Sequence, residues 1–145
     1  DCAEKNVFVV ATTNRIDAID PAIIRKGRMD EVVYVGLPDR DARKELLEIE
    51  LLKRPHENVD IDLLVERTQG YSASDISFIV KECARCSFEE SVRSNQLVKI
   101  NQTLLEDTIS KTRPSVTGDE LSAYERTNDS FVKGQNQERP RIGFK

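Results

Sequence analysis

The chain has 145 residues, of which 38% are hydrophobic and 33% are charged, which is enough for one domain with an ordinary core. Its 22 Lys and Arg residues against 26 Asp and Glu give a net charge of -4, so we expect no positive electrostatic potential that would bind the phosphate backbone of nucleic acid. No apolar run approaches the roughly 18 residues that cross a bilayer, and the N-terminus lacks a signal-peptide pattern, so we expect a cytoplasmic protein without a membrane partner. The odd number of cysteines, three, does not make a disulfide framework and agrees with a reducing compartment.

Two apolar segments near the N-terminus are predicted as strands. Residues 7–11 and 31–36 are rich in valine, and the first is a continuous apolar run, typical of a strand covered on both faces of a parallel sheet. Between them, Asp20 and Pro21 are typical of the cap and first turn of a short helix. Because two strands cannot form a stable sheet alone, we expect these segments to pair with chain outside this sequence or to remain poorly ordered.

After Pro38 the hydrophobic period becomes helical, and five helix-start signals follow. A side-chain oxygen at each start can accept a hydrogen bond from the first turn of the helix, and two of the starts carry an acidic residue three positions later, as in a capping box. The signals are Asp39, Asp60, Ser72 with Asp75, Asn101, and Thr117 with Glu120. The first helix should run to about Arg54, and Gly70 should stop the second.

Four of these helices are amphipathic and can enclose one core, whereas the fifth stands apart. The fold class is therefore mostly α, with a two-strand portion at residues 1–38, a four-helix unit at 39–113, a separate helix at 114–132 and a loose tail at 133–145. The residues expected to face inward are Ala42, Leu46, Leu47, Ile49, Leu51, Lys53, Ile61, Leu64, Val65, Thr68, Ile76, Ile79, Val80, Cys83, Ala84, Phe88, Leu104, Leu105, Thr108 and Ile109. The fifth helix presents the apolar side chains of Leu121 and Tyr124, and Phe131 is left open as a third.

The histidine and cysteines offer little chemistry. His56 is the single histidine, and a surface or structural role suits it better than catalysis. Cys83 and Cys86 form one C-x-x-C on a predicted helix, but zinc needs more ligands than this pair supplies. We therefore expect no metal site, with Cys83 packed in the core and Cys86 in a neutral position.

An unusual polar cluster lies between the first predicted strand and the second. Asn14 follows the first strand, at the end where parallel sheets bind ligands, and its amide could hold a water beside a phosphate; a turn residue is an equally good interpretation. Arg25 and Arg28 flank Gly27 and offer planar forks of donors that suit phosphate oxygens. The alternative for the arginines is a surface ion pair with the acidic residues at 30 and 31.

The run ATTNRIDAIDPAIIRKGRMDEVVYVGLPD, residues 11–39, resembles the second half of the ATPase core of AAA proteins, the family of valosin-containing protein, katanin and the proteasomal ATPases. In that family it reads approximately ATNRPDxLDPALxRxGRFD, followed by a strand and the P-D that opens a helical lid. GYSASDI at residues 70–76 is similar to the family's G-x-S/T-G-A-D-L, and RPSVTGDELSAYE at 113–125 is similar to the end of the lid. The resemblance covers about residues 1–131.

The resemblance assigns roles to five residues. Asn14 corresponds to the sensor-1 asparagine, which contacts the γ-phosphate and positions the attacking water. Arg25 and Arg28 correspond to arginine fingers that reach into the neighbouring subunit's ATP site, and Ala73 and Ser74 correspond to the small pair whose backbone approaches the nucleotide.

Three positions depart from the family pattern. Ile16 replaces a proline, Met29 replaces a phenylalanine, and Glu50 replaces a histidine near the adenine and ribose. The departure at Glu50 leaves a nucleotide contact at that position open.

Two parts of an ATP site are missing from the sequence. None of the six glycines belongs to a G-x-x-x-x-G-K-[ST] phosphate loop, and no apolar strand ends in an acidic pair for Mg²⁺. We therefore expect the C-terminal part of a longer ATPase that uses ATP and Mg²⁺, works as a homo-hexamer on protein substrates, and is inactive as this fragment alone. The alternatives are a stand-alone helical interaction module with a relic ATPase segment and, with little support, nucleic-acid binding by the basic residues 139–145.

Overall fold

The computed structural model describes residues 7–24, 27–29 and 31–135, and the chain divides into two compact units, Asp1–Val35 and Gly36–Lys145. The predicted loose tail lies largely outside the described residues. The mostly helical fold class is confirmed, because α-helices provide nearly all of the regular structure in the described part. Within that part, no helix combines the length and the apolar composition that crossing a membrane requires.

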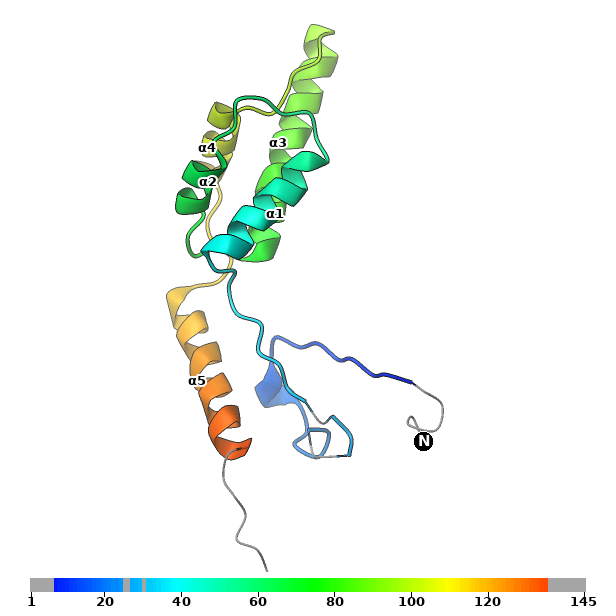
Figure 1. The fold of residues 1–145 in the computed structure, drawn as a ribbon, viewed down its shortest axis with the longest axis vertical. Helices are drawn as coiled ribbons and strands as arrows, with labels where there is room; N and C mark the ends of the chain where they lie inside the picture. The colour runs from blue at the N-terminus through cyan, green and yellow to red at the C-terminus, as the bar shows by residue number, and fades with distance from the viewer. Residues whose placement is uncertain (1–6, 25–26, 30, 136–145) are drawn as a thin grey trace, which may run out of the picture. The chain divides into compact units, whose positions relative to one another are not determined.

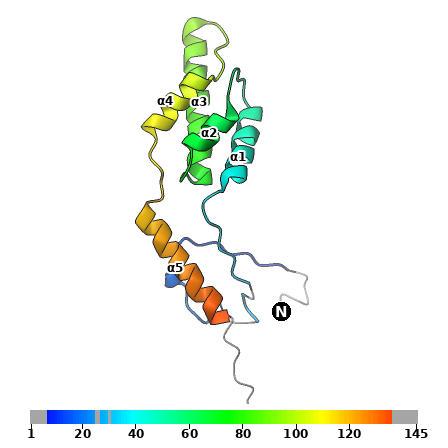
Figure 2. The same ribbon diagram turned by 60° about the vertical axis from the view of Figure 1, so that its left-hand side comes forward.

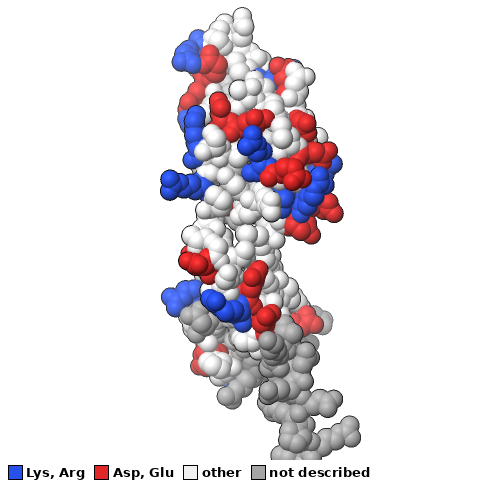
Figure 3. Space-filling view, turned by 90° about the vertical axis from the view of Figure 1, so that its left-hand side faces the viewer, with Lys and Arg blue, Asp and Glu red and all other residues white. Residues whose placement is uncertain are grey.

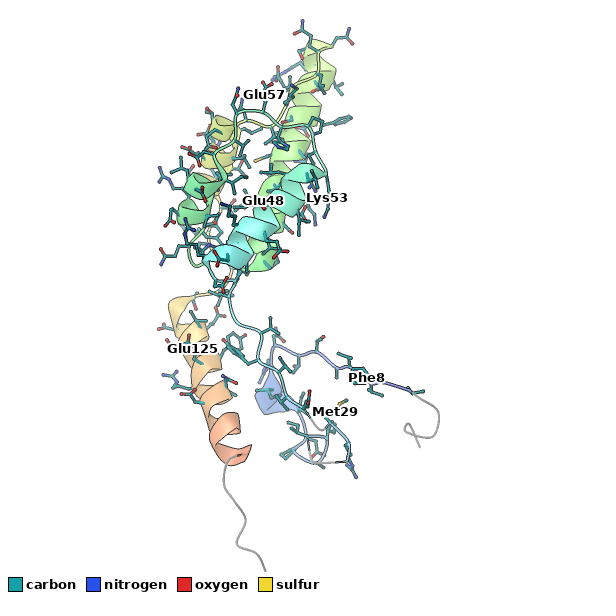
Figure 4. All side chains as sticks on the ribbon, in the orientation of Figure 1. Phe8, Met29, Glu48, Lys53, Glu57 and Glu125 are labelled. Atoms are coloured by element: carbon teal, nitrogen blue, oxygen red, sulfur yellow. The ribbon has the colours of Figure 1, made fainter. Side chains whose placement is uncertain are left out.

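The first unit carries little regular structure in its described residues. The two segments predicted as strands form no ladder there, as expected for strands without partners in this sequence. Their apolar side chains are uncovered: Phe8 is 90% exposed and stands out from the backbone (Figure 4). The short helix predicted at Asp20 is a single turn instead, closed by a 2.9 Å hydrogen bond from the Ile23 N–H to the Asp20 carbonyl. A 3-10 turn, η2, spans Ile16–Ala18.

In its described residues, the second unit contains five helices (Figure 1). They are α1 (Arg40–Leu52), α2 (Ile61–Arg67), α3 (Ala73–Ser94), α4 (Gln102–Lys111) and α5 (Gly118–Gln135). Helix α1 packs against α2 and α3, and α4 packs against the same two helices, so that the first four form one bundle in both ribbon views (Figure 2). Among the described residues, α5 packs against none of these four.

The helix starts predicted from capping signals are confirmed. In α1 to α4 the cap side chain accepts a hydrogen bond from a first-turn backbone N–H at 2.9 to 3.2 Å. The observed caps are Asp39, Asp60, Ser72, Asn101 and, for α5, Thr117. Ser72 and Asp75 form the predicted reciprocal capping box. Gly70, just beyond α2, has a φ of +83°, a left-handed conformation that favours glycine.

The bundle encloses one apolar core. Its buried members include residues from all four helices and from the segments that join them. They are Leu47, Leu51, Leu64, Val65, Tyr71, Ile76, Ile79, Val80, Cys83, Ile100, Leu105 and Ile109. Two loop segments also meet, because the Ile100 N–H donates to the Pro55 carbonyl at 3.0 Å and the Glu57 N–H donates to the Ile100 carbonyl at 2.9 Å.

Three residues expected to face inward do not. Ile49 is 44% exposed, Phe88 is 68% exposed, and Lys53 is exposed as well. The buried line of α1 runs through Arg43, Leu47 and Leu51, and this spacing of four residues turns Ile49 and Lys53 toward solvent. Phe88 lies about 100° around α3 from its buried neighbour Ser87. On α5, Leu121 is half-buried and Tyr124 is 36% exposed, while the side chain of residue 131 lies outside the described part.

Ion pairs connect α1 to α2 on the surface of the bundle. Arg40 Nε lies 3.1 Å from Glu66 Oε1, and Lys44 Nζ lies 3.0 Å from Asp62 Oδ1. Acidic and basic side chains are interspersed over the face of the helical unit that Figure 3 shows. Exposed pairs of this kind contribute about 0 to 1 kcal/mol each, so the core provides most of the stability.

Candidate functional site

Asn14 lies in a bend after the extended N-terminal segment. Its side chain is exposed. The backbone N–H of Arg15 donates to Thr13 Oγ1 at 2.9 Å, which holds the bend on either side of Asn14. The carboxamide of Asn14 is therefore presented to solvent on a locally ordered turn, where it can both donate and accept hydrogen bonds.

Arg28 follows Gly27, whose φ of +87° is a left-handed conformation. The Arg28 side chain is exposed, and its Nη1 donates to the Ala22 carbonyl at 3.1 Å. The ion pairs found within the described ranges include none between Arg28 and Glu31. The other predicted finger, Arg25, and the acidic residue at 30 lie outside the described residues.

Ala73 and Ser74 form the first turn of α3, and both are exposed. The first backbone N–H groups of a helix have no partner within the helix, and the helix dipole favours an anion there. Ser74 Oγ lies 2.8 Å from Ser72 Oγ. The small side chains leave this turn open to the close approach of a polyanionic ligand.

Asp75 belongs to the same first turn of α3, and its carboxylate accepts more hydrogen bonds than the capping-box pattern alone predicts. Asp75 Oδ2 accepts from the Ser72 N–H at 2.9 Å and from Ser72 Oγ at 2.8 Å, as a capping box requires. It also accepts from the Ser115 N–H at 3.1 Å and Ser115 Oγ at 3.0 Å. Burial alone would raise the pKa of Asp75, but the hydrogen bonds from Ser115 and Ser72 together lower it below its ordinary value.

Glu50 connects the end of α1 to α3. Its Oε2 accepts from Arg54 Nη1 at 2.8 Å, and its Oε1 accepts from Ser77 Oγ at 3.2 Å. Lys53 Nζ lies 3.5 Å from the same Oε1. Burial acts to raise the pKa of Glu50, yet the hydrogen bonds from Arg54 and Ser77 and the charge of Lys53 together lower it. Both carboxylate oxygens are thus engaged within the bundle.

Cys83 is a core residue, as predicted. It is fully buried, and its Sγ lies 3.2 Å from Thr108 Oγ1. Burial raises the pKa of the Cys83 thiol. His56 Nδ1 lies 2.9 Å from the Arg54 carbonyl oxygen in an exposed loop.

Each of the two units presents an exposed polar feature in its described residues. The exposed first turn of α3 suits a phosphate or sugar, and the Asn14 amide suits a water. No group of three or more metal-ligating side chains occurs in the portion of the chain that the structure describes, and the sequence contains no phosphate loop. A surface hollow of about 530 Å³ lies elsewhere, between the C-terminal half of α3 and the start of α4, where Ser87, Lys99 and Leu104 are among its lining residues.

Sequence comparison relates both units to one kind of protein. Residues 1–37 match the family described as "ATPase family associated with various cellular activities (AAA)", and residues 58–102 match the "AAA+ lid domain". The chain is 35% identical over 138 residues to the cell division cycle protein 48 homolog of Archaeoglobus fulgidus, an alignment that covers 88% of the chain and 19% of that relative. The chain thus spans about a fifth of the length of the curated relative that it matches.

Proposed function

The chain belongs to the AAA family of ATPases, and from this premise we propose that it supplies the sensor, arginine-finger and lid elements of an ATP-hydrolysing ring. We assign residues 1–38 to the ATPase core, 39–113 to the lid and 114–132 to a C-terminal helix. The observation that carries the proposal is the order of the two matches, with the AAA family over residues 1–37 and the lid over 58–102.

Asn14 and the arginines serve two different nucleotide sites in this proposal. The exposed Asn14 amide orients the attacking water at the γ-phosphate of its own subunit. Arg28, together with Arg25, donates to the phosphate of the neighbouring subunit, and Arg28 exchanges its hydrogen bond to the Ala22 carbonyl for phosphate oxygens. An arginine supplied from a neighbour is worth about 10³ to 10⁵ in rate because it meets charge that develops in the transition state.

The lid contributes through the first turn of α3. Ala73 and Ser74 are exposed and small, so the nucleotide can approach their backbone N–H groups. Bound Mg²⁺-ATP supplies the phosphoryl group and the metal charge, and the residues of this chain orient water and stabilise developing charge. Because the sequence lacks a phosphate loop, the chain alone does not hydrolyse ATP.

We further propose a homo-hexamer that remodels protein substrates in the cytoplasm. The requirement for a ring follows from the division of labour between Asn14 and the arginines, which act on opposite sides of each subunit. A reducing compartment suits the free thiols of Cys83 and Cys86.

Mixed rings test the proposal. In an ATPase that contains this chain, Arg28→Ala and Asn14→Ala should each lower ATP turnover by orders of magnitude, while Arg28→Ala leaves the mutated subunit's own ATP affinity nearly unchanged. Rings that mix the two variants should regain turnover at interfaces where an intact Arg28 meets an intact Asn14. Arg93→Ala, at the exposed end of α3, is the matched control and should have no effect.

Two outcomes would count against the proposal. If Arg28→Ala abolishes ATP binding by its own subunit, the arginine acts locally. If neither variant alters turnover, the chain is better explained as a helical interaction module.

A further inference from the structure

We propose that Asp75 is a positioning residue that couples the nucleotide-facing turn of α3 to the segment leading into α5, through its contact with Ser115. This contact is called the Asp75–Ser115 pin below. The inference rests on the proposed function only in placing Ala73 and Ser74 at a nucleotide. The pin itself consists of side chains and backbone groups within the helical unit.

The pin is additional to the cap of α3. The two bonds from Ser72 to Asp75 Oδ2, together with the 3.2 Å bond from the Asp75 N–H to Ser72 Oγ, complete the capping box without help from Ser115. Ser115 nevertheless directs both its N–H and its hydroxyl at the same Oδ2. Asp75 is only 9% exposed, whereas Ser115 is exposed, and hydrogen bonds to a carboxylate are charge-assisted and stronger than neutral ones.

A second contact holds the same segment from the residue that precedes the cap. Tyr71, which is buried, donates from its hydroxyl to the Thr112 carbonyl at 2.7 Å. The hydroxyl also lies 3.3 Å from the Ile109 carbonyl oxygen at the end of α4. The chain leaving α4 is therefore held to the start of α3 at two points, Thr112 and Ser115.

The pinned segment is followed almost immediately by the start of α5. Only Val116 separates Ser115 from Thr117, the cap of α5. Thr117 donates from its N–H at 2.9 Å and from its hydroxyl at 2.8 Å to Glu120 Oε2, and the Glu120 N–H donates back to Thr117 Oγ1 at 3.3 Å. Two capping boxes, one on α3 and one on α5, are thus joined through one carboxylate and one intervening residue. A displacement of the first turn of α3 is transmitted to the start of α5 because few backbone rotations lie between them.

Distance measurements between spin labels on α3 and α5 test the coupling. The labels are attached at Lys81→Cys and Arg126→Cys, both exposed, after Cys2, Cys83 and Cys86 have been replaced by alanine. In an ATPase ring that contains this chain, the label-to-label distance distribution should differ between bound ADP and a slowly hydrolysed ATP analogue. Asp75→Asn and Ser115→Ala should broaden the distribution and remove its response to nucleotide.

Ser72→Ala is the matched control. It removes the Ser72 hydroxyl, which caps α3 and also lies 3.3 Å from Ser115 Oγ, and it should lower the melting temperature. It leaves both Ser115 donors on Asp75 and should preserve the nucleotide response. Nucleotide binding is measured on the same samples with a fluorescent ATP analogue, and circular dichroism confirms that each variant is folded.

The outcomes separate the coupling from the proposed function. Normal nucleotide binding with an unchanged response in both Asp75→Asn and Ser115→Ala would overturn the coupling alone. Loss of the response in Ser72→Ala as well would show that Asp75 acts only through the cap, and would also overturn it. A wild-type ring that binds no nucleotide would overturn the proposed function and the coupling with it.

Discussion

The guanidinium of Arg43 donates two hydrogen bonds to the carbonyl oxygen of Val65, from Nε at 3.3 Å and from Nη2 at 3.2 Å. Its Nη1 donates to the Pro38 carbonyl at 3.1 Å. Arg43 is only 7% exposed, and each of these three hydrogen bonds is to a backbone carbonyl. The side chain therefore joins α1 to α2 and holds the chain where it enters the helical unit.

Replacing Arg43 should destabilise the helical unit. Arg43→Ala removes three hydrogen bonds to the carbonyls of Val65 and Pro38 and the packing of the buried side chain, so we expect a loss of about 2 to 3 kcal/mol in the free energy of unfolding. Urea denaturation followed by circular dichroism measures this. Arg40→Ala, on the same helix but in an exposed ion pair, should cost less than about 1 kcal/mol. Equal losses in the two variants would contradict a structural role for the buried guanidinium.

Glu50 should make stability depend on pH. Its pKa is lower in the folded chain than its ordinary value of 4.5, so the ionised carboxylate stabilises the fold above the unfolded pKa. That contribution is lost as the pH falls through the folded pKa. Glu50→Gln should reduce the free energy of unfolding at neutral pH by about 1 kcal/mol. It should also make the decrease of that free energy with falling pH less steep.

The measurement is urea denaturation at a series of pH values from neutral into the acid range. Glu48→Gln is the control, because Glu48 is an exposed neighbour on the same helix and its replacement should leave the curve unchanged. A Glu50→Gln curve parallel to that of the unmodified chain would show that the carboxylate adds no pH-dependent stability.

The two cysteines of α3 should differ in reactivity. Cys83 is buried and its thiol pKa is raised, whereas Cys86 is half-buried. Alkylation of native chain, mapped by peptide mass spectrometry, should modify Cys83 on the order of a hundredfold or more slowly than Cys86, because Cys83 reacts only when the bundle opens. In denaturant the two rates should converge. Similar rates in the native chain would mean that the core around Cys83 opens readily.

Isolated chain should bind Mg²⁺-ATP weakly or not at all. The sequence contains neither a phosphate loop nor an acidic pair after a strand to offset the cost of capturing a polyanion. Isothermal titration calorimetry is the measurement, and Arg28→Ala should give the same trace as the unmodified chain. Micromolar affinity would contradict the assignment of this chain to the sensor and lid elements.

Limited proteolysis should distinguish the two units. The apolar segments of residues 7–35 are exposed and form no ladder among the described residues, so cleavage should begin there, while α1 to α4 persist as one fragment. Arg43→Ala should accelerate cleavage within the bundle. Early cleavage inside residues 76–90 of the unmodified chain would contradict a stable helical unit.

Local sequence signals were sufficient to predict the helix starts and the family. A cap acts through residues two or three positions away, so Asp39, Asp60, Ser72 and Asn101 could be identified from neighbours alone. The run from Asn14 to Asp39 is equally local, and it indicated the AAA family before any contact was known.

Which face of each helix is buried, and which polar groups contact one another, follows from how the helices pack in the folded chain. The apolar stripe of α1 is broad, so the sequence did not show which side of the helix faces the core. Packing against α2 and α3 buries Arg43, Leu47 and Leu51. The same packing leaves Ile49 exposed. Arg43 finds its acceptors 22 residues away at Val65 and Asp75 finds Ser115 40 residues away. Such pairings depend on how the helices are placed against one another, because burial removes the competing water and makes each unmet donor or acceptor costly.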